Sequence, residues 1–284
     1  MDHRLRSGIA LLFLGMSLGG CGVWRAFFPS HHHDRVPPEL PAGLHAPAVL
    51  VFSKTNGFRH EEAIPAGVAL IREIAERRGW SVFATENGAA FRPEVLEQFE
   101  AVVWQAATGD VLDDEQKGAF RSWLTAGHGW VGIHAAGDGS HTWPWYRKSL
   151  IGVAYGQHPL GPQIQQARIH VEDRSHPATR ALPEEFLHTE EWYSFESSPR
   201  TRGFHVLATV DESSYQPEVH FLWMERDLRM GDDHPIVWTT CVQRGRALYT
   251  ALGHQAAAYR TPEMRALVEG ALEWALGLAG PDCP

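Results

Sequence analysis

Short apolar runs alternate with amphipathic stretches between residues 48 and 134, and this alternation constrains the fold more than any other feature. The first run, residues 48–52, is apolar throughout, which indicates a strand buried on both faces. Residues 65–78 carry apolar side chains at helical spacing, and Gly79 supplies a stop. The same reasoning predicts strands at 81–85, 101–104 and 130–134 and helices at 91–98 and 113–126. Alternating strands and helices form right-handed βαβ units, so we expect an α/β fold with a mainly parallel sheet.

The second half of the chain has a different pattern, in which strands follow one another without intervening helices. We expect strands at residues 168–172, 204–210 and 220–225, a hairpin of 236–242 with 247–252, and a terminal helix over 262–278. The chain has 284 residues, 44% of them hydrophobic, which is ample material for one core. We therefore expect one domain over residues 46–280, with extra β-rich segments in its second half.

The N-terminus has the character of a bacterial lipoprotein signal peptide, which we assign to residues 1–20. Two arginines precede an apolar run of about ten residues, too short to span a bilayer and typical of a signal peptide. The run ends in Leu18-Gly19-Gly20-Cys21, which resembles a lipobox. We expect lipidation at Cys21 and a membrane-anchored protein of the cell envelope, periplasmic or on the outer surface. Cleaved secretion and an uncleaved anchor are the alternatives.

Residues 21–45 contain several prolines and no apolar period, so we expect an extended, mobile tether. Its three consecutive histidines, His31 to His33, either bind a metal weakly or form part of a solvated linker. The formal net charge of the chain is −9, and without a basic run this argues against nucleic-acid binding. The oligomeric state is not readable from these features.

Two cysteines remain if Cys21 carries lipid. Cys241 and Cys283 would lie in an oxidising compartment, where a disulfide between them is one alternative. The other alternative, which we favour from the sequence, is that Cys241 is a small core residue within an apolar strand.

The turn after the strand at residues 130–134 carries the strongest functional signal. The strand ends in Gly132-Ile133-His134-Ala135-Ala136. A tight turn of small residues at this place raises one side chain above the carboxyl edge of a parallel sheet, here His134. An imidazole ligates a metal or moves a proton, but it does not replace Ser or Cys as the usual acyl-forming nucleophile. The glycines at 127–132 match a dinucleotide-binding pattern in letters only, because they precede the strand, so we expect no nucleotide cofactor.

Histidine recurs at the ends of other predicted strands. His60 follows the first strand and His254 follows the last, so both are expected at the same sheet edge as His134. Three imidazoles with a carboxylate suit zinc, manganese or iron, which makes these residues candidate metal ligands. Asp138 and Glu191 are the candidate carboxylates, and with His134 they form the predicted catalytic group. Each histidine taken alone fits a structural, hydrogen-bonding role better than a functional one, and it is the three matching positions together that favour a site.

Several aromatic and imidazole side chains are candidates for substrate contact. Flat indole rings suit the C–H faces of sugars, although they also pack in cores. The candidates are Trp143, Trp145, Trp192, His158 and His234.

Taken together, these motifs resemble those of the ThuA (trehalose utilisation) family over about residues 47–278. The segments that carry the resemblance are Gly57-Phe58-Arg59-His60, Gly132-Ile133-His134-Ala135-Ala136, Trp143-Pro144-Trp145-Tyr146, Glu190-Glu191-Trp192-Tyr193, His234-Pro235 and Gly253-His254. The resemblance implies a class I glutamine amidotransferase-like fold, a flavodoxin-like three-layer sandwich. It also implies a link to bacterial catabolism of disaccharides and keto-sugars. His134 stands where amidotransferases have their nucleophilic Cys, so we do not expect a glutaminase.

Two functions follow from this reading. The first is an enzyme, a hydrolase, lyase or isomerase, that acts on a disaccharide or keto-sugar at a His-rich site. Either a divalent metal serves there or, without metal, His134 or Glu191 acts as general base. The second is a saccharide-binding or scaffold lipoprotein without catalysis. Turnover that depends on His134 distinguishes the two.

Overall fold

The computed structural model describes residues 28–221 and 223–283. The predicted signal peptide and Cys21 lie outside the described residues. Within the described part of the chain, no helix has both the length and the apolar character that a membrane crossing requires.

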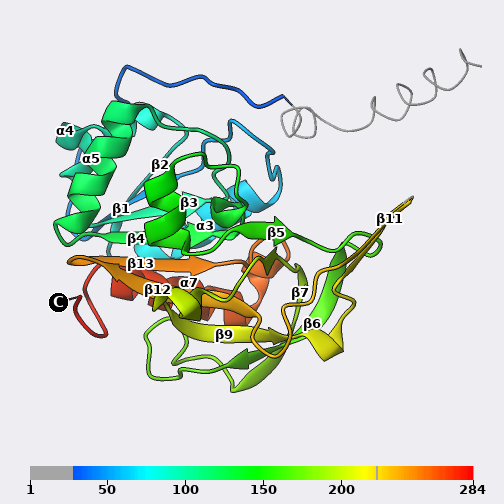
Figure 1. Cartoon of the computed structure of the whole chain (residues 1–284). Helices are drawn as coiled ribbons and strands as arrows, with labels where there is room; N and C mark the ends of the chain where they lie inside the picture. The colour runs from blue at the N-terminus through cyan, green and yellow to red at the C-terminus, as the bar shows by residue number, and fades with distance from the viewer. Residues whose placement is uncertain (1–27, 222, 284) are drawn as a thin grey trace, which may run out of the picture.

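A nine-stranded sheet runs through the molecule in the order β2-β1-β3-β4-β13-β12-β9-β6-β7 (Figure 1). Its first five strands are parallel: β2 (Ser81–Thr85), β1 (Ala48–Phe52), β3 (Ala101–Gln105), β4 (Gly129–Ile133) and β13 (Gly245–Thr250). The remaining strands are antiparallel to their neighbours: β12 (Pro235–Val242), β9 (His205–Asp211), β6 (Ile164–Val171) and β7 (Glu185–Glu191). The expected α/β fold is confirmed, with the β-rich segments extending the parallel sheet.

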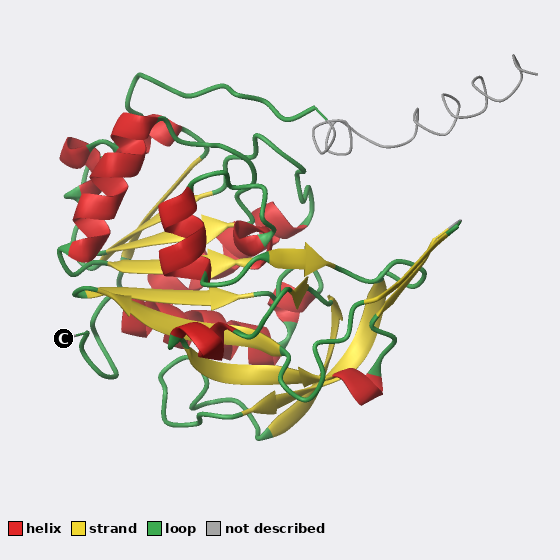
Figure 2. Ribbon diagram, in the orientation of Figure 1, coloured by secondary structure: helices red, strands yellow, loops and turns green. Residues whose placement is uncertain are grey.

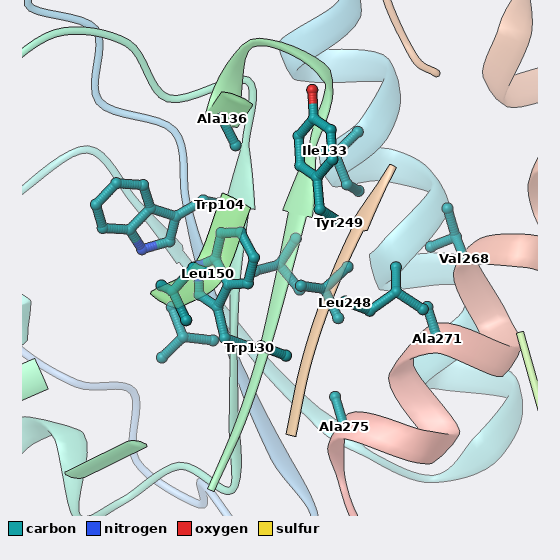
Figure 3. Packing of buried hydrophobic residues seen from close by; sticks show 14 of the residues in the cluster. Trp104, Trp130, Ile133, Ala136, Leu150, Leu248, Tyr249, Val268, Ala271 and Ala275 are labelled. Carbon is teal, nitrogen blue, oxygen red and sulfur yellow. The ribbon is translucent and has the colours of Figure 1, made fainter. Parts of the chain in front are cut away.

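Helices cover both faces of the sheet and complete the predicted three layers (Figure 2). The larger helices are α3 (Ala63–Arg78), α5 (Asp114–Thr125) and α7 (Pro262–Ala275). Helices α3 and α7 contact each other, while α5 packs beside the short α4 (Pro93–Leu96). Figure 3 shows Val268, Ala271 and Ala275 of α7 beside Leu248 of β13, with Trp130 on the other side of the sheet. These side chains are fully or almost fully buried, so each sheet face has its own apolar layer.

Shorter elements occupy the connections. The one-turn elements are η2 (Gly88–Phe91), η3 (His134–Gly137), α6 (Pro144–Tyr146), η4 (Arg147–Ile151), η5 (Pro199–Arg202), η6 (Glu212–Ser214) and η7 (Ala258–Arg260). Two small antiparallel pairs join β5 (Tyr155–Gln157) to β8 (Ser194–Phe195) and β10 (Glu218–Phe221) to β11 (Met224–Asp227).

Two predicted elements differ from the structure, and strand β7 was missed. The predicted helix at 91–98 is two pieces, η2 and α4, because Pro93 starts a new helix at its own first position. The predicted strand at 220–225 is the β10–β11 hairpin, which reverses within that range. Strand β7 was not predicted, because its sequence is polar at most positions, as an exposed edge strand permits.

The predicted mobile tether is wrong for its middle part, because the segment from Phe28 to Val36, which we call the strap, is bound to the domain. The backbone N–H of Ser30 donates to the carbonyl of Asn56 at 2.7 Å. The carboxylate of Asp34 accepts a hydrogen bond from the N–H of Gly88 at 2.8 Å and pairs with Lys54. These partners follow β1 and β2, so the strap lies at the carboxyl edge of the sheet.

The cysteine prediction that we favoured is also wrong. Cys241 is exposed near the end of β12 and forms a disulfide with Cys283, with 5.4 Å between their Cα atoms. The side chains of β12 become accessible beyond Thr239, so an apolar strand sequence did not imply burial at this position. The bond joins the tail after α7 to the sheet.

The imidazole of His176 predicts how stability depends on pH. It is 4% exposed and packs against Trp274, and its Nε2 has no hydrogen-bond partner in the part of the chain that the structure describes. Burial lowers its pKa to about 4. The unfolded chain binds this proton below about pH 6.5, whereas the folded chain does not until about pH 4, so stability is lost as pH falls through that window.

We expect this group alone to lower the free energy of unfolding by about 2 kcal/mol between about pH 7.5 and pH 5. His176→Asn keeps an acceptor for the N–H of Ala178 but does not titrate. Urea unfolding at both pH values should show a weaker pH dependence in the variant. Equal pH dependence in the two proteins contradicts the assignment.

Candidate metal centre

The backbone at His134 places its imidazole at the carboxyl edge of the sheet. The residue follows β4 directly and has a φ of +51°, a left-handed conformation that is uncommon for a residue with a Cβ. The hydroxyl of Tyr249 holds this turn by donating to the carbonyl of His134 at 2.8 Å. The imidazole Nδ1 lies 2.8 Å from the carbonyl of Ala251. Because a carbonyl only accepts, Nδ1 carries the proton and Nε2 is the atom available to a ligand.

Three imidazoles from different parts of the chain meet at this point. His60 lies between β1 and α3, and His254 follows β13. The ring centroid of His60 is 4.8 Å from that of His134 and 5.0 Å from that of His254, and the last two are 5.1 Å apart. The histidines therefore converge as their places at strand ends predict.

Glu191 completes the group from the end of β7. Its Oε2 lies 3.4 Å from Nε2 of His134 and 3.2 Å from Nδ1 of His254. Its other oxygen, Oε1, accepts a hydrogen bond from Gln163 and lies 3.5 Å from Nε2 of His158. One oxygen thus faces the imidazoles while the other is held by the pocket wall.

Burial and charge set the ionisation of this group. Burial alone would raise the pKa of Glu191, but His134 and His254 outweigh it and lower the pKa well below its usual value. For His134, burial opposes protonation, yet Glu191 and Glu190 raise the pKa. Burial and the neighbouring imidazoles lower the pKa of His60 far below its usual value, so its ring is neutral at pH 7. A neutral imidazole and an ionised carboxylate are the forms that bind metal.

The residues fit a divalent metal ion. His60, His134, His254 and Glu191 each offer one ligand atom, and these atoms lie within 4.8 Å of one another. Nδ1 of His60 is buried and has no hydrogen-bond partner among the described residues, which is costly unless a ligand occupies it. Three nitrogens and one oxygen form a donor set typical of zinc, manganese or iron sites.

A pocket of about 260 Å³ opens over these side chains. It is lined by Phe58, His60, Asp138, Tyr155, His158, Gln163, Glu191, Tyr193 and His254. The hydroxyl of Tyr193 lies 3.2 Å from Nε2 of His134. Burial raises the pKa of Asp138, although His141 and Ser140 act in the opposite direction. The site therefore combines the candidate metal ligands with a carboxyl group suited to donate a proton.

Four predicted substrate contacts lie elsewhere and are corrected here. Trp143 and Trp145 pack against each other with ring centroids 4.8 Å apart, near Phe120 and away from the pocket lining. Trp192 is 1% exposed, and its indole N–H donates to the carbonyl of Gln165. His234 is fully buried, between the carbonyl of Tyr193 and the carboxylate of Glu212. Trp192 belongs to the core, whereas Trp143 and Trp145 are half-buried and pack against it. Of the five candidates, only His158 lines the pocket.

Sequence reasoning missed the role of Glu190. This carboxylate is 1% exposed and accepts hydrogen bonds from the N–H groups of Glu191, Gly253 and His254, at 2.9, 2.6 and 3.1 Å. It thereby fixes the segment that carries His254 against the end of β7. The sequence shows two adjacent glutamates, but it does not show which backbone N–H groups Glu190 binds.

Comparison with known proteins agrees with this fold. The family model ThuA, described as trehalose utilisation, matches residues 48–275. A ThuA-like protein from Bacteroides uniformis aligns with a TM-score of 0.69 and 23% identity, covering 84% of this chain and 94% of that one. A ThuA-like protein from Parabacteroides merdae aligns with a TM-score of 0.58 and 19% identity, covering 84% and 92%. Among curated proteins, none matches this chain.

We expect the purified protein to bind about one divalent ion per chain, because four donors converge on one point. Isothermal titration with Zn²⁺ or Mn²⁺ and elemental analysis measure this. His60→Ala and Glu191→Gln should each weaken binding at least 10-fold. The matched control is His205→Ala, a histidine on β9 with a side chain 57% exposed. Equal metal content in all four proteins contradicts the site.

Glu190→Gln should weaken metal binding by about 10–100-fold, because the amide offers one acceptor oxygen in place of two. Titration of the same metal measures this effect, and thermal unfolding without metal measures any general loss of stability. The control is Glu185→Gln, which changes an exposed carboxylate on the same strand. Unchanged metal affinity in Glu190→Gln would show that Glu190 does not position the ligands.

Proposed function

Because this chain belongs to the ThuA family of trehalose-utilisation proteins, we propose that it is an enzyme of bacterial carbohydrate catabolism that acts on a keto-sugar at a metal-dependent site. The observation that carries the proposal is the convergence of His60, His134, His254 and Glu191 beneath an open pocket. A protein that served only as a scaffold would not need four potential ligand atoms within 4.8 Å of one another. The absence of a Ser or Cys nucleophile at residue 134 argues for acid–base rather than acyl-transfer chemistry.

The size of the pocket favours a single sugar ring. Its volume of about 260 Å³ lies just under the range of about 300–1,000 Å³ usual for pockets that hold drug-sized ligands. We infer that one ring of a disaccharide enters while the second remains at the mouth. Phe58 and Tyr155 supply the apolar wall that a ring face requires.

The chemistry proposed for the residues divides between ligands and proton carriers. A divalent ion held by the cluster would polarise a carbonyl or acidify a water molecule. His158 is the candidate base, because its Nδ1 lies 3.0 Å from the carbonyl of Pro159 and must be the protonated nitrogen, which leaves Nε2 to accept a proton. Asp138 is the candidate acid, since burial favours its protonated form. Glu191 serves as a ligand, because its oxygens already face His134, His254 and Gln163.

The proposal also covers the location of the protein, which is the cell envelope. We propose that Cys21 is lipidated and anchors the domain to a membrane. The disulfide between Cys241 and Cys283 supports export, because such bonds persist in oxidising compartments.

The activity is tested with purified protein, a keto-disaccharide and its unoxidised parent. We expect turnover of the keto-sugar that is lost with chelator and restored by metal. His134→Ala should remove it, Asp138→Asn should lower kcat by about 100-fold or more, and His205→Ala should leave it unchanged. Turnover that persists in His134→Ala contradicts the proposal. Saccharide binding without turnover, insensitive to chelator, identifies a binding protein instead.

A further inference from the structure

The β10–β11 hairpin, which we call the arm, projects from the same sheet edge that carries the pocket. The arm lies in the chain between β9 and β12. Strand β9 is antiparallel to β12, and β12 is antiparallel to β13, so β9 runs in the direction of β13 and ends at the carboxyl edge. Figure 1 shows β11 extending away from the body of the molecule. Four residues per strand give the arm a reach of about 13 Å.

The tip of the arm exposes apolar side chains to solvent. Trp223 is 86% exposed and Met224 is 44% exposed. Single exposed apolar residues are common on proteins, but an indole at the end of a projecting hairpin has little protein surface within reach. Tryptophan is the side chain most suited to the boundary between lipid headgroups and acyl chains.

The strap emerges from the same edge as the arm. Ser30 is hydrogen-bonded to Asn56, beyond the end of β1, and Asp34 is bonded to Gly88, beyond the end of β2. Six residues lie between Cys21 and Phe28, and even a fully extended chain spans at most about 25 Å between these two residues. A membrane that holds Cys21 therefore lies close to the carboxyl edge of the sheet. Because the strap is docked, the chain between Phe28 and Cys21 sets how far the domain can lie from its anchor.

We propose that the arm is a second membrane contact, in which Trp223 and Met224 enter the interface of the bilayer that holds Cys21. This inference rests on the lipid anchor included in the proposed function. The anchor supplies the high local concentration of lipid that lets one hairpin tip bind without strong affinity of its own. The strap is bound after β1 and β2 and the arm follows β9. In the sheet order, β4 and β13, which carry His134 and His254, lie between these strands. A sugar substrate thus reaches the site from the space between the domain and the membrane.

The full-length lipidated protein is reconstituted in phosphatidylethanolamine–phosphatidylglycerol vesicles that contain brominated phosphatidylcholine, which quenches indole fluorescence on contact. Trp24 is replaced by Phe in every sample, because it lies three residues after Cys21 in the sequence. We expect quenching in this background, loss of most of it with Trp223→Phe, and no loss with the control Trp143→Phe.

Equal quenching with and without Trp223 overturns the arm contact. So does a protein dimer that becomes a monomer with Trp223→Phe, since the tip would then bind a second copy. Mass spectrometry of the Cys21 peptide tests the anchor separately. If the peptide is unacylated and no protein is found in the vesicle fraction, both the anchor and the arm contact are rejected. If the peptide is acylated but Trp223 is not quenched, the arm contact alone is rejected.

Discussion

The parallel pairing of β4 with β13 is the contact on which the rest of the structure depends. It places Ile133 beside Thr250, so that the segments after both strands leave the sheet at the same level. His134 then reaches the carbonyl of Ala251, and its ring meets that of His254 although 120 residues separate them. The antiparallel strands that continue from β13 to β7 return the chain to the same edge and deliver Glu191. One register thus joins both halves of the chain into one site.

Glu190 and Glu191 show how an extended strand separates two identical side chains. Successive residues of a strand point to opposite faces. Glu191 therefore faces the imidazoles, while Glu190 faces the backbone of residues 253 and 254 and accepts its N–H groups. Both carboxylates have lowered pKa values in spite of burial, because each has cationic or N–H partners. Glu191 thus lines the pocket, while Glu190 holds the backbone beneath it.

The parallel half of the fold and the three histidines could be predicted, because continuous apolar runs mark buried strands and the carboxyl ends of such strands share an edge. Strand β7 could not, since an edge strand tolerates a polar sequence. The strap has the composition of a linker, yet its backbone and the carboxylate of Asp34 form hydrogen bonds with the domain. Composition alone does not predict such hydrogen bonds. Trp192 and His234 carry no sign in the sequence of whether they face a ligand or the core, and the structure buries both.

The bond between Cys241 and Cys283 bears on how the metal content of this protein is measured. In a reducing cytoplasm the same two residues would be thiols with Cα atoms 5.4 Å apart. Thiolates are strong zinc ligands, and two of them on adjacent segments would collect the ion in competition with the imidazoles. Two thiolates are fewer than the four ligands of a structural zinc site, so zinc held there would be bound weakly and would add to the count made on protein from a reducing host. Oxidised protein has no thiolate at these two positions, so its metal content excludes this contribution.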